Sequence, residues 1–338
     1  MPDKNEKSKE TLPIVIIGAG IAGLCISFYL NKKNIPHIII EKGKAGNTWI
    51  EERWDNFHLV NPNWAMKIPE FGFESDHFPS KDPNGFLNKK EIVNYIQSFA
   101  RYLNSEIYEN ENVIKISKNN NSYEIQTSKR LIHTNTVIIA TGAFGNPYIP
   151  EIHKNLDKDI FQIHSSKYKN STGLPEGKVV VVGSGQSGAQ IAEDLLDSGR
   201  KVILAVSKCG RRPRKYRSKD SSWWNYEMGL FDKTVNDVKL EERWKCSAHT
   251  SGAKGGHDIN LIDLAENGLE LCGSIKNCQG NKLFLKDNVY ENVKFSDTYA
   301  INWRKNVDEF ITKNNIKAPQ ESIKIDERIQ SNILKNYD

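Results

Sequence analysis

The chain has 338 residues, of which 38% are hydrophobic and 26% are charged. This composition is typical of a folded globular protein rather than of a disordered one. The net charge of +5 is small for this length, so bulk charge gives no support to a nucleic-acid-binding function.

The N-terminal region and the cysteines predict a cytoplasmic protein. Residues 1–10 form a polar tail without the apolar segment of a signal peptide. The apolar stretch over residues 12–30 is interrupted by three glycines, which predicts a strand, a turn and a helix rather than a membrane span. An odd number of scattered thiols is typical of a reducing compartment, and their spacing predicts no metal site. The cysteines are Cys25, Cys209, Cys246, Cys272 and Cys278.

A first glycine fingerprint follows the tail. Residues 14–17 are a continuous apolar run, which predicts a buried parallel strand. Gly18, Gly20 and Gly23 then form the pattern GxGxxG, and apolar residues at helical spacing come after it. Residues 37–40 predict the next strand, which ends at Glu41. A glycine-rich turn without a ligand is the alternative interpretation, but the flanking strand, helix and acid favour a dinucleotide site.

Each part of this fingerprint has a physical role. Gly18 makes the tight turn, Gly20 lets the backbone approach a diphosphate, and Gly23 lets the helix pack closely on the strand. The N-terminus of the helix supplies N–H donors and a positive dipole to the phosphates. Glu41 can accept hydrogen bonds from a ribose diol, which implies a ribose without a 2′-phosphate. This first unit is therefore predicted to bind FAD.

The same pattern occurs a second time. The first unit ends with a predicted strand at 136–140, and a Gly/Pro-rich connection at 145–150 leads to the second unit. There, a predicted strand at 179–182 precedes a second GxGxxG, and the next strand is predicted at 201–206. Two βαβ units predict an α/β fold with two Rossmann-like, dinucleotide-binding domains. The second fingerprint consists of Gly183, Gly185 and Gly188.

The predicted domains are an FAD-binding domain at 11–150, an NADPH-binding domain at 151–290 and a C-terminal helical segment at 291–338. Trp303 and Val307 lie at helical spacing in that last segment.

The second fingerprint predicts NADPH rather than NADH. Its second strand ends in Val206 and Ser207, where an NAD site would carry an acid. A carboxylate there would repel a 2′-phosphate, whereas a hydroxyl and nearby cations would bind it. A solvated loop or a nucleic-acid patch is the alternative interpretation of this basic run. The cations are Lys208, Arg211, Arg212 and Arg214.

The route by which electrons leave the flavin separates two classes of flavoprotein. Disulfide reductases carry a cysteine pair just after the FAD acid or within the NADPH unit. Here residues 46–49 read GNTW, and no cysteine pair is recognised in the second unit. A dithiol relay is therefore excluded, and dioxygen is the expected electron acceptor.

The stretch GNTWIEERWDNFHLVNPNW over residues 46–64 resembles the bacterial CzcO-like flavoproteins and, more distantly, the class B flavin monooxygenases. Residues 85–100, 137–150, 179–196, 211–224, 228–238 and 251–261 also match, so the resemblance extends from about residue 12 to 318. It implies two domains of the glutathione-reductase type, arranged as a three-layer ββα sandwich, with the FAD-binding domain of this sequence incomplete at its C-terminal end. It also implies FAD, NADPH and oxygenation of a small-molecule substrate by dioxygen through a flavin C4a-(hydro)peroxide.

The resemblance also implies roles for four further residues. Thr48 and Trp49 would lie against the flavin or its nucleotide, although an ordinary core indole is the alternative for Trp49. Thr141 and Gly142, from the ATG motif, would mark the strand end where the first unit meets the second.

This sequence departs from the family pattern in two places. The monooxygenase fingerprint FxGxxxHxxxY is half present, with His164 and Tyr168 matching but Lys158 and Ile160 in place of Phe and Gly. The family also has a further C-terminal segment with a second ATG-like strand, which this sequence lacks. The alternative function is therefore a truncated homologue that binds dinucleotides and is catalytically dead or uncoupled.

Overall fold

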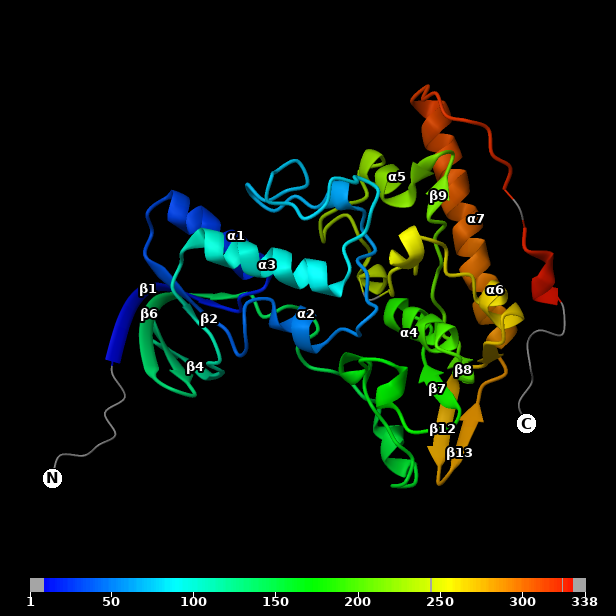
Figure 1. The fold of residues 1–338 in the computed structure, drawn as a ribbon, viewed down its shortest axis with the longest axis horizontal. Helices are drawn as coiled ribbons and strands as arrows, with labels where there is room; N and C mark the ends of the chain where they lie inside the picture. Colours follow the sequence, from blue (N-terminus) through cyan, green and yellow to red (C-terminus); the bar gives the residue numbers. More distant parts are fainter. Residues whose placement is uncertain (1–8, 244, 324, 331–338) are drawn as a thin grey trace. The chain divides into compact units, whose positions relative to one another are not determined.

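The computed structural model describes residues 9–243, 245–323 and 325–330, and the chain divides into two compact units (Figure 1). The first unit comprises the residues up to 53 together with 63–148. The second comprises 54–62 together with the residues from 149 onward. Within the part of the chain that the structure describes, no helix combines the length and apolar character that a bilayer crossing requires.

A six-stranded sheet in the order β3-β2-β1-β6-β5-β4 forms the centre of the first unit. Strands β3, β2, β1 and β6 are parallel, whereas β5 and β4 continue the sheet in antiparallel fashion. The strands are β1 (Lys9–Ile17), β2 (His37–Ile40), β3 (Ile107–Tyr108), β4 (Val113–Asn119), β5 (Ser122–Thr127) and β6 (Leu131–Ile139).

The predicted strand at 37–40 is β2, and those at 14–17 and 136–140 are the ends of the longer strands β1 and β6. Residues 1–8 of the predicted polar tail lie outside the described residues.

The two faces of this sheet are covered differently. Helices α1 (Ile21–Lys32) and α3 (Lys89–Leu103) lie together on one face (Figure 1). On the other face, Val15 and Ile38 pack in one buried cluster with Ile125 of β5 and Ile132 of β6. Helices, parallel strands and antiparallel strands thus form three layers. The predicted α/β class with a three-layer ββα arrangement is confirmed.

The N-terminus of α3 shows why this helix starts where it does. Asn88 accepts a hydrogen bond from the backbone N–H of Glu91 at 3.0 Å, and the Glu91 carboxylate accepts one from the N–H of Asn88 at 2.8 Å. This capping box satisfies two N–H donors that have no partner within the helix.

A three-stranded parallel sheet in the order β11-β8-β7 forms the centre of the second unit. Helix α4 (Gln186–Asp197) connects β7 (Val179–Val182) to β8 (Val202–Ala205), and β11 (Glu270–Cys272) pairs with β8. Within the described residues, the other edge of β7 has no strand partner. Its Val182 is 66% exposed.

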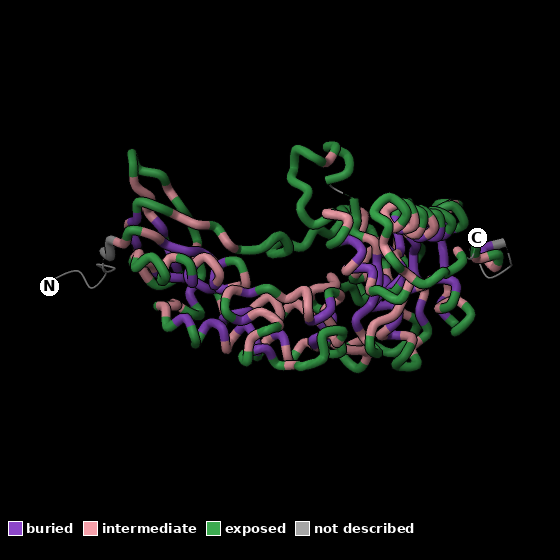
Figure 2. The backbone as a smooth tube through the Cα atoms, turned by 90° about the horizontal axis from the view of Figure 1, so that it is seen from above, coloured by how far each residue is buried: buried purple, intermediate pink, exposed green. Residues whose placement is uncertain are grey.

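A long helix of the second unit, α7 (Val289–Lys313), contains the predicted Trp303 face. Trp303 and Val307 form a buried cluster with Tyr216 and Trp224. Figure 2 shows buried segments in each of the two units. The remaining elements are α2 (Asn47–Glu51) in the first unit and β9 (Lys215–Tyr216), β10 (Lys219–Asp220), α5 (Ser221–Glu227), α6 (Leu261–Glu266), β12 (Ile275–Gln279) and β13 (Lys282–Leu285) in the second.

Candidate functional site

The glycines of the first fingerprint differ in what requires them. Gly18 has φ +108°, and a methyl group on it would lie 2.5 Å from the carbonyl oxygen of Ala140. A methyl group on Gly23 would lie 1.9 Å from the carbonyl oxygen of Gly18. Gly20, in contrast, has φ −83°, and a methyl group on it would meet nothing within 4 Å. The fold therefore requires Gly18 and Gly23, while the space beside Gly20 stays open to a ligand.

Glu41 is held beside this turn by the backbone. Its Oε2 accepts a hydrogen bond from the N–H of Ala19 at 2.8 Å, and its Oε1 accepts one from the N–H of Gly43 at 3.0 Å. The side chain is only 7% exposed. Because each carboxylate oxygen has two lone pairs, the fixed carboxylate can still accept hydrogen bonds from a ligand.

The GNTW turn lies next to the same loop. Gly46, in the left-handed region at φ +77°, donates its N–H to the carbonyl oxygen of Ala19 at 2.9 Å. Helix α2 starts there and carries Thr48 and Trp49, which are both half-buried. The guanidinium of Arg53 lies 5.2 Å from the centre of the Trp49 ring. A nucleotide contact for Thr48 and Trp49 stays a prediction.

The end of β6 completes this edge of the sheet. The N–H of Ala140 donates to the carbonyl oxygen of Ile17 at 2.8 Å, and the methyl position on Gly18 lies 3.3 Å from the backbone nitrogen of Thr141. Thr141 and Gly142 are both exposed. The structure thus brings the fingerprint, Glu41, the GNTW turn and the ATG motif together at the carboxyl ends of parallel strands, where open α/β sheets bind ligands.

The second fingerprint repeats the geometry of the first. Gly183 has φ +92°, and a methyl group on Gly188 would lie 1.9 Å from the carbonyl oxygen of Gly183. Helix α4 begins directly after Gly185, whose φ of −68° is close to that of Gly20. One difference stands out at the second glycine, because a methyl group on Gly185 would lie 3.0 Å from Cys246 Sγ.

The strand register identifies the counterpart of Glu41. The N–H of Gly18 donates to Ile40, and the N–H of Gly183 donates to Ala205. The residue that matches Glu41 is therefore Val206, and Ser207 lies one position further along. Even so, Ser207 Oγ accepts a hydrogen bond from the backbone N–H of Ser184 at 3.2 Å. A neutral hydroxyl thus takes the N–H that a carboxylate takes in the first loop.

The predicted phosphate-binding cations differ in their availability. Arg211 is buried, and its guanidinium donates to the carboxylate of Asp297, with Nε 2.7 Å from Oδ1. Asp258 lies 3.7 Å from the same guanidinium. A role for Arg211 in phosphate binding would require it to leave this pair. Arg214 is likewise paired with Asp220 at 2.6 Å.

Arg212 and Lys208 have different partners. The Nε of Arg212 donates to the hydroxyl of Ser221 at 3.0 Å, and burial, followed by the charge of Arg214, lowers the pKa of its guanidinium. Lys208 is exposed, with its ammonium 4.9 Å from the Phe295 ring centre. Among the described residues, the structure records no carboxylate pair for either of these cations. Contact with a phosphate would therefore break no such pair.

Two thiols of the second unit, those of Cys209 and Cys246, interact with each other. A hydrogen bond from Cys209 and one from the backbone N–H of Gln186 lower the pKa of Cys246. The expectation that the second unit has no cysteine pair is thereby corrected. The two residues lie far apart in the sequence, so they form no recognisable motif.

The half-present monooxygenase fingerprint lies on short turns. Tyr168 is buried, and its hydroxyl donates to Asp194 at 2.6 Å. Burial and this hydrogen bond raise the pKa of the phenol. His164 Nδ1 accepts a hydrogen bond from the N–H of Ser166 at 3.2 Å. The contact of Tyr168 ties this segment to α4, whereas that of His164 is local to its turn.

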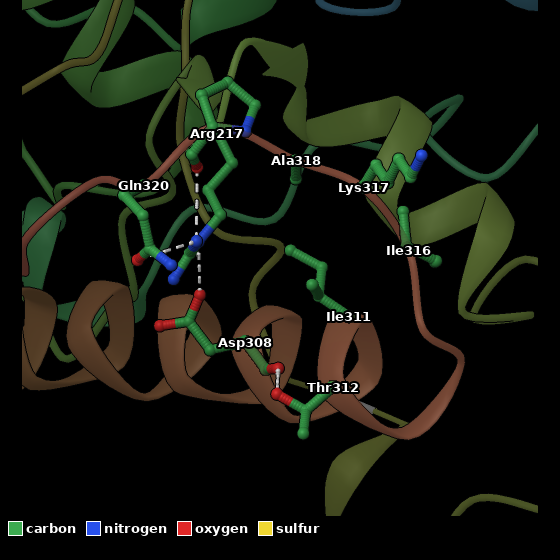
Figure 3. A pocket seen from close by; sticks show the side chains of 9 residues that line it. Arg217, Asp308, Ile311, Thr312, Ile316, Lys317, Ala318 and Gln320 are labelled. Carbon is green, nitrogen blue, oxygen red and sulfur yellow. Dashed lines mark hydrogen bonds and ion pairs between the residues drawn. The ribbon is translucent and has the colours of Figure 1, made fainter.

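Two cavities in the second unit contain none of the predicted site residues. The larger, of about 530 Å³, lies beside the C-terminal part of α7, where Arg217 bonds to Asp308 (Figure 3). The smaller, of about 330 Å³, lies along α4 and is lined by Glu193 and Asp194 among others. Glu193 is hydrogen-bonded to His257 at 2.6 Å, which raises the pKa of this imidazole.

Comparisons with known proteins agree with this geometry. The sequence pattern of the pyridine nucleotide-disulphide oxidoreductases matches residues 15–242. An uncharacterized CzcO-like oxidoreductase of Geobacillus kaustophilus is 34% identical over 225 residues, which are 66% of this chain and 62% of the relative. The probable indole-3-pyruvate monooxygenase YUCCA1 of Arabidopsis thaliana is 30% identical over 57% of this chain and 46% of its own length.

This chain therefore spans about three fifths of the CzcO-like relative. Among solved structures, a flavin-containing monooxygenase from Stenotrophomonas maltophilia aligns with a TM-score of 0.54 and 16% identity, over 90% of this chain and 99% of that protein. This likeness concerns the fold.

Proposed function

The chain belongs to the pyridine nucleotide-disulphide oxidoreductase family, and from this premise we propose that it is an FAD- and NADPH-dependent oxidoreductase that uses dioxygen to oxygenate a small molecule. The observation that carries the proposal is that the glycine loop occurs twice, with a different side chain at the end of the second strand in each unit. The first loop ends at a carboxylate and the second at a hydroxyl. Two different dinucleotides fit this difference.

FAD is assigned to the first loop and to the domain at 11–150. The open space beside Gly20 fits a diphosphate, and the N-terminus of α1 supplies its N–H donors. The fixed carboxylate of Glu41 fits a ribose diol that carries no phosphate. Thr48, Trp49, Thr141 and Gly142 are proposed to border the remainder of the cofactor.

NADPH is assigned to the second loop and to the domain at 151–290. Val206 leaves the position of the ribose-binding acid without a charge, and Ser207 supplies a hydroxyl there. Lys208 and Arg212 would neutralise the 2′-phosphate. Arg211 is proposed to act indirectly, because its pair with Asp297 ties the loop after β8 to α7.

The chemistry follows from the cofactors and from what the chain lacks near them. Bound FAD supplies hydride acceptance from NADPH and electron transfer to dioxygen. The GNTW turn beside the first loop contains no cysteine, so it offers no dithiol exit for electrons. The residues of the chain bind and orient the two cofactors, and an oxygenase must also keep water from the reaction. Similarity to a probable indole-3-pyruvate monooxygenase supports dioxygen as the acceptor.

We expect the purified protein to show flavin absorbance and to consume oxygen when NADPH is added. Without its substrate, hydrogen peroxide should appear about one-for-one with NADPH oxidised, because oxygen that is not transferred to a substrate is released in reduced form. Spectrophotometry and an oxygen electrode measure both quantities. Anaerobic turnover of a disulfide substrate at the aerobic rate would overturn the proposal. Absence of any flavin would favour the alternative of a dead homologue.

Arg212→Ala is expected to raise the Kd for NADPH about tenfold or more, because a charge-assisted hydrogen bond contributes about 1.5–3 kcal/mol. NADH lacks the 2′-phosphate, so its Kd should change little. Fluorescence titration of both nucleotides checks this. The control is Arg217→Ala, which removes an arginine that bonds to Asp308 beside the larger cavity. Equal losses for both nucleotides would show that Arg212 does not read the phosphate.

A further inference from the structure

Cys209 and Cys246 are brought together by two chain segments that run side by side. Residues 209–212 follow β8, and the carbonyl oxygen of Gly210 accepts the N–H of His249 at 2.9 Å. A parallel bridge joins Arg211 to His249. Cys209 therefore lies opposite Ser247, whose carbonyl oxygen is 3.5 Å from Cys209 Sγ. Cys246 directly precedes Ser247, and its interaction with the Cys209 thiol lowers the pKa of Cys246.

Cys246 also lies over the second glycine loop. Its Sγ is 3.0 Å from the position of a methyl group on Gly185, the glycine whose backbone a diphosphate must approach. The N–H of Gln186, the first residue of α4, is directed at this sulfur. Cys246 thus takes up a donor that an anion at this helix N-terminus would use.

The two thiols differ in a way that suits disulfide chemistry. Cys246 is exposed, and its interactions with Cys209 and with the N–H of Gln186 lower its pKa, which favours the thiolate. Cys209 is buried, and it donates its S–H. A solvent-accessible thiolate beside a second thiol is the arrangement in which peroxide forms a disulfide.

We propose that hydrogen peroxide converts Cys209 and Cys246 to a disulfide, which holds the Cys246 sulfur over Gly185 and closes the second loop to NADPH. This inference rests on the proposed function, because it takes the second loop to be the NADPH site. It adds a redox modification site to that function. The oxidant is the hydrogen peroxide that is released when NADPH is oxidised without oxygen transfer to a substrate.

The reaction balances in two steps. The Cys246 thiolate attacks one peroxide oxygen, the O–O bond breaks, and a sulfenic acid and hydroxide are formed. The Cys209 sulfur then attacks the sulfenic sulfur, the S–O bond breaks, and the departing hydroxide takes the Cys209 proton as water. The hydroxide of the first step takes up the proton that Cys246 lost on becoming a thiolate. In total, two thiols lose two electrons, one peroxide is reduced, and two waters result. A small dithiol reverses the change.

Closure follows from how Cys246 is held in each state. In the reduced protein only hydrogen bonds hold the exposed thiol, so a diphosphate can displace it from Gln186. In the disulfide a covalent bond fixes it beside the buried Cys209. NADPH and disulfide formation should then oppose each other by linkage.

The remaining cysteines serve as internal controls. Burial raises the pKa of Cys272 to about 11, and burial also raises the pKa of Cys25. Cys278 is buried and donates to the carbonyl oxygen of Ile152. All three should react slowly with peroxide.

The first experiment treats the purified full chain with hydrogen peroxide and maps its disulfides by mass spectrometry after digestion. We expect a Cys209–Cys246 crosslink that dithiothreitol removes and that saturating NADPH slows. Absence of this crosslink, while Cys25 becomes oxidised, would overturn the proposal. This readout requires neither FAD nor activity.

The second experiment measures the NADPH Kd by fluorescence titration before and after peroxide. We expect a loss of about tenfold or more, because the diphosphate loses its donor and its space at the helix N-terminus. Cys209→Ser and Cys246→Ser should each abolish the effect of peroxide, whereas Cys25→Ser should retain it. A crosslink that leaves the Kd unchanged would refute closure. If the reduced protein binds no NADPH, the proposed function fails, while the crosslink still tests the thiol pair.

Discussion

We expect Gly20→Val to give a folded protein without FAD, whereas Gly185→Val should keep its flavin. This is the expected result because a side chain at Gly20 meets no protein atom within 4 Å of its first carbon and so obstructs only the ligand. The diphosphate needs close approach of the backbone at this position, and a branched side chain prevents it. We expect flavin to be lost almost completely during gel filtration, with Gly20→Ala showing a smaller loss.

The other glycines of the loop supply the contrast. Gly23→Ala places a methyl group 1.9 Å from a backbone oxygen, so this variant should lose stability as well as flavin. Absorbance spectra report the flavin, and circular dichroism melting reports the fold. If Gly20→Val retained flavin while Gly185→Val lost it, the assignment of the two loops would be reversed.

Val206→Glu is expected to change the nucleotide preference from NADPH to NADH by about a hundredfold or more. Val206 is in register with Glu41, so a carboxylate here reaches the N–H of Ser184 as Glu41 reaches that of Ala19. Like charges near a protein surface at about 4 Å repel by about 4 kcal/mol, and the 2′-phosphate is strongly negative. The ratio of kcat/KM values for the two nucleotides measures the change.

Val206→Gln is the matched control, because the glutamine side chain has nearly the same shape as that of glutamate but carries no charge. It should weaken both nucleotides alike through altered packing, since Val206 is buried. If Glu and Gln gave the same ratio, charge would not decide the preference at this position.

Local sequence patterns predicted the parallel core well. The short apolar run that became β2 is buried over most of its length, as a central parallel strand is, and consecutive apolar residues reveal this. The similar run that became β7 is partly exposed, because β7 lies at the edge of its sheet. The strands β4 and β5 were not predicted. Neither strand contains a continuous apolar run, and β4 is mostly exposed. The two strands are defined by pairing, β5 with β6 and β4 with β5.

In the candidate site too, features formed by neighbouring residues could be predicted from the sequence, whereas contacts between distant residues could not. The glycine spacing and Glu41 could be read directly, because the turn geometry depends on neighbouring residues. The pairing of Arg211 with Asp297 joins residues that are 86 positions apart, and no local pattern reveals it. The meeting of Cys209 with Cys246 likewise depends on how the loop after β8 runs beside a distant segment.

The free edge of β7 has a practical consequence for work with this protein. Within the part of the chain that the structure describes, no strand pairs with this edge, which lies next to the exposed Val182, and such an edge is a template on which another extended chain can add as a strand. Such addition is second order in protein concentration, so material lost to precipitation should increase steeply as samples are concentrated. Dilute conditions and low temperature, at which apolar association weakens, therefore suit this chain better than the concentrated stocks common in crystallisation.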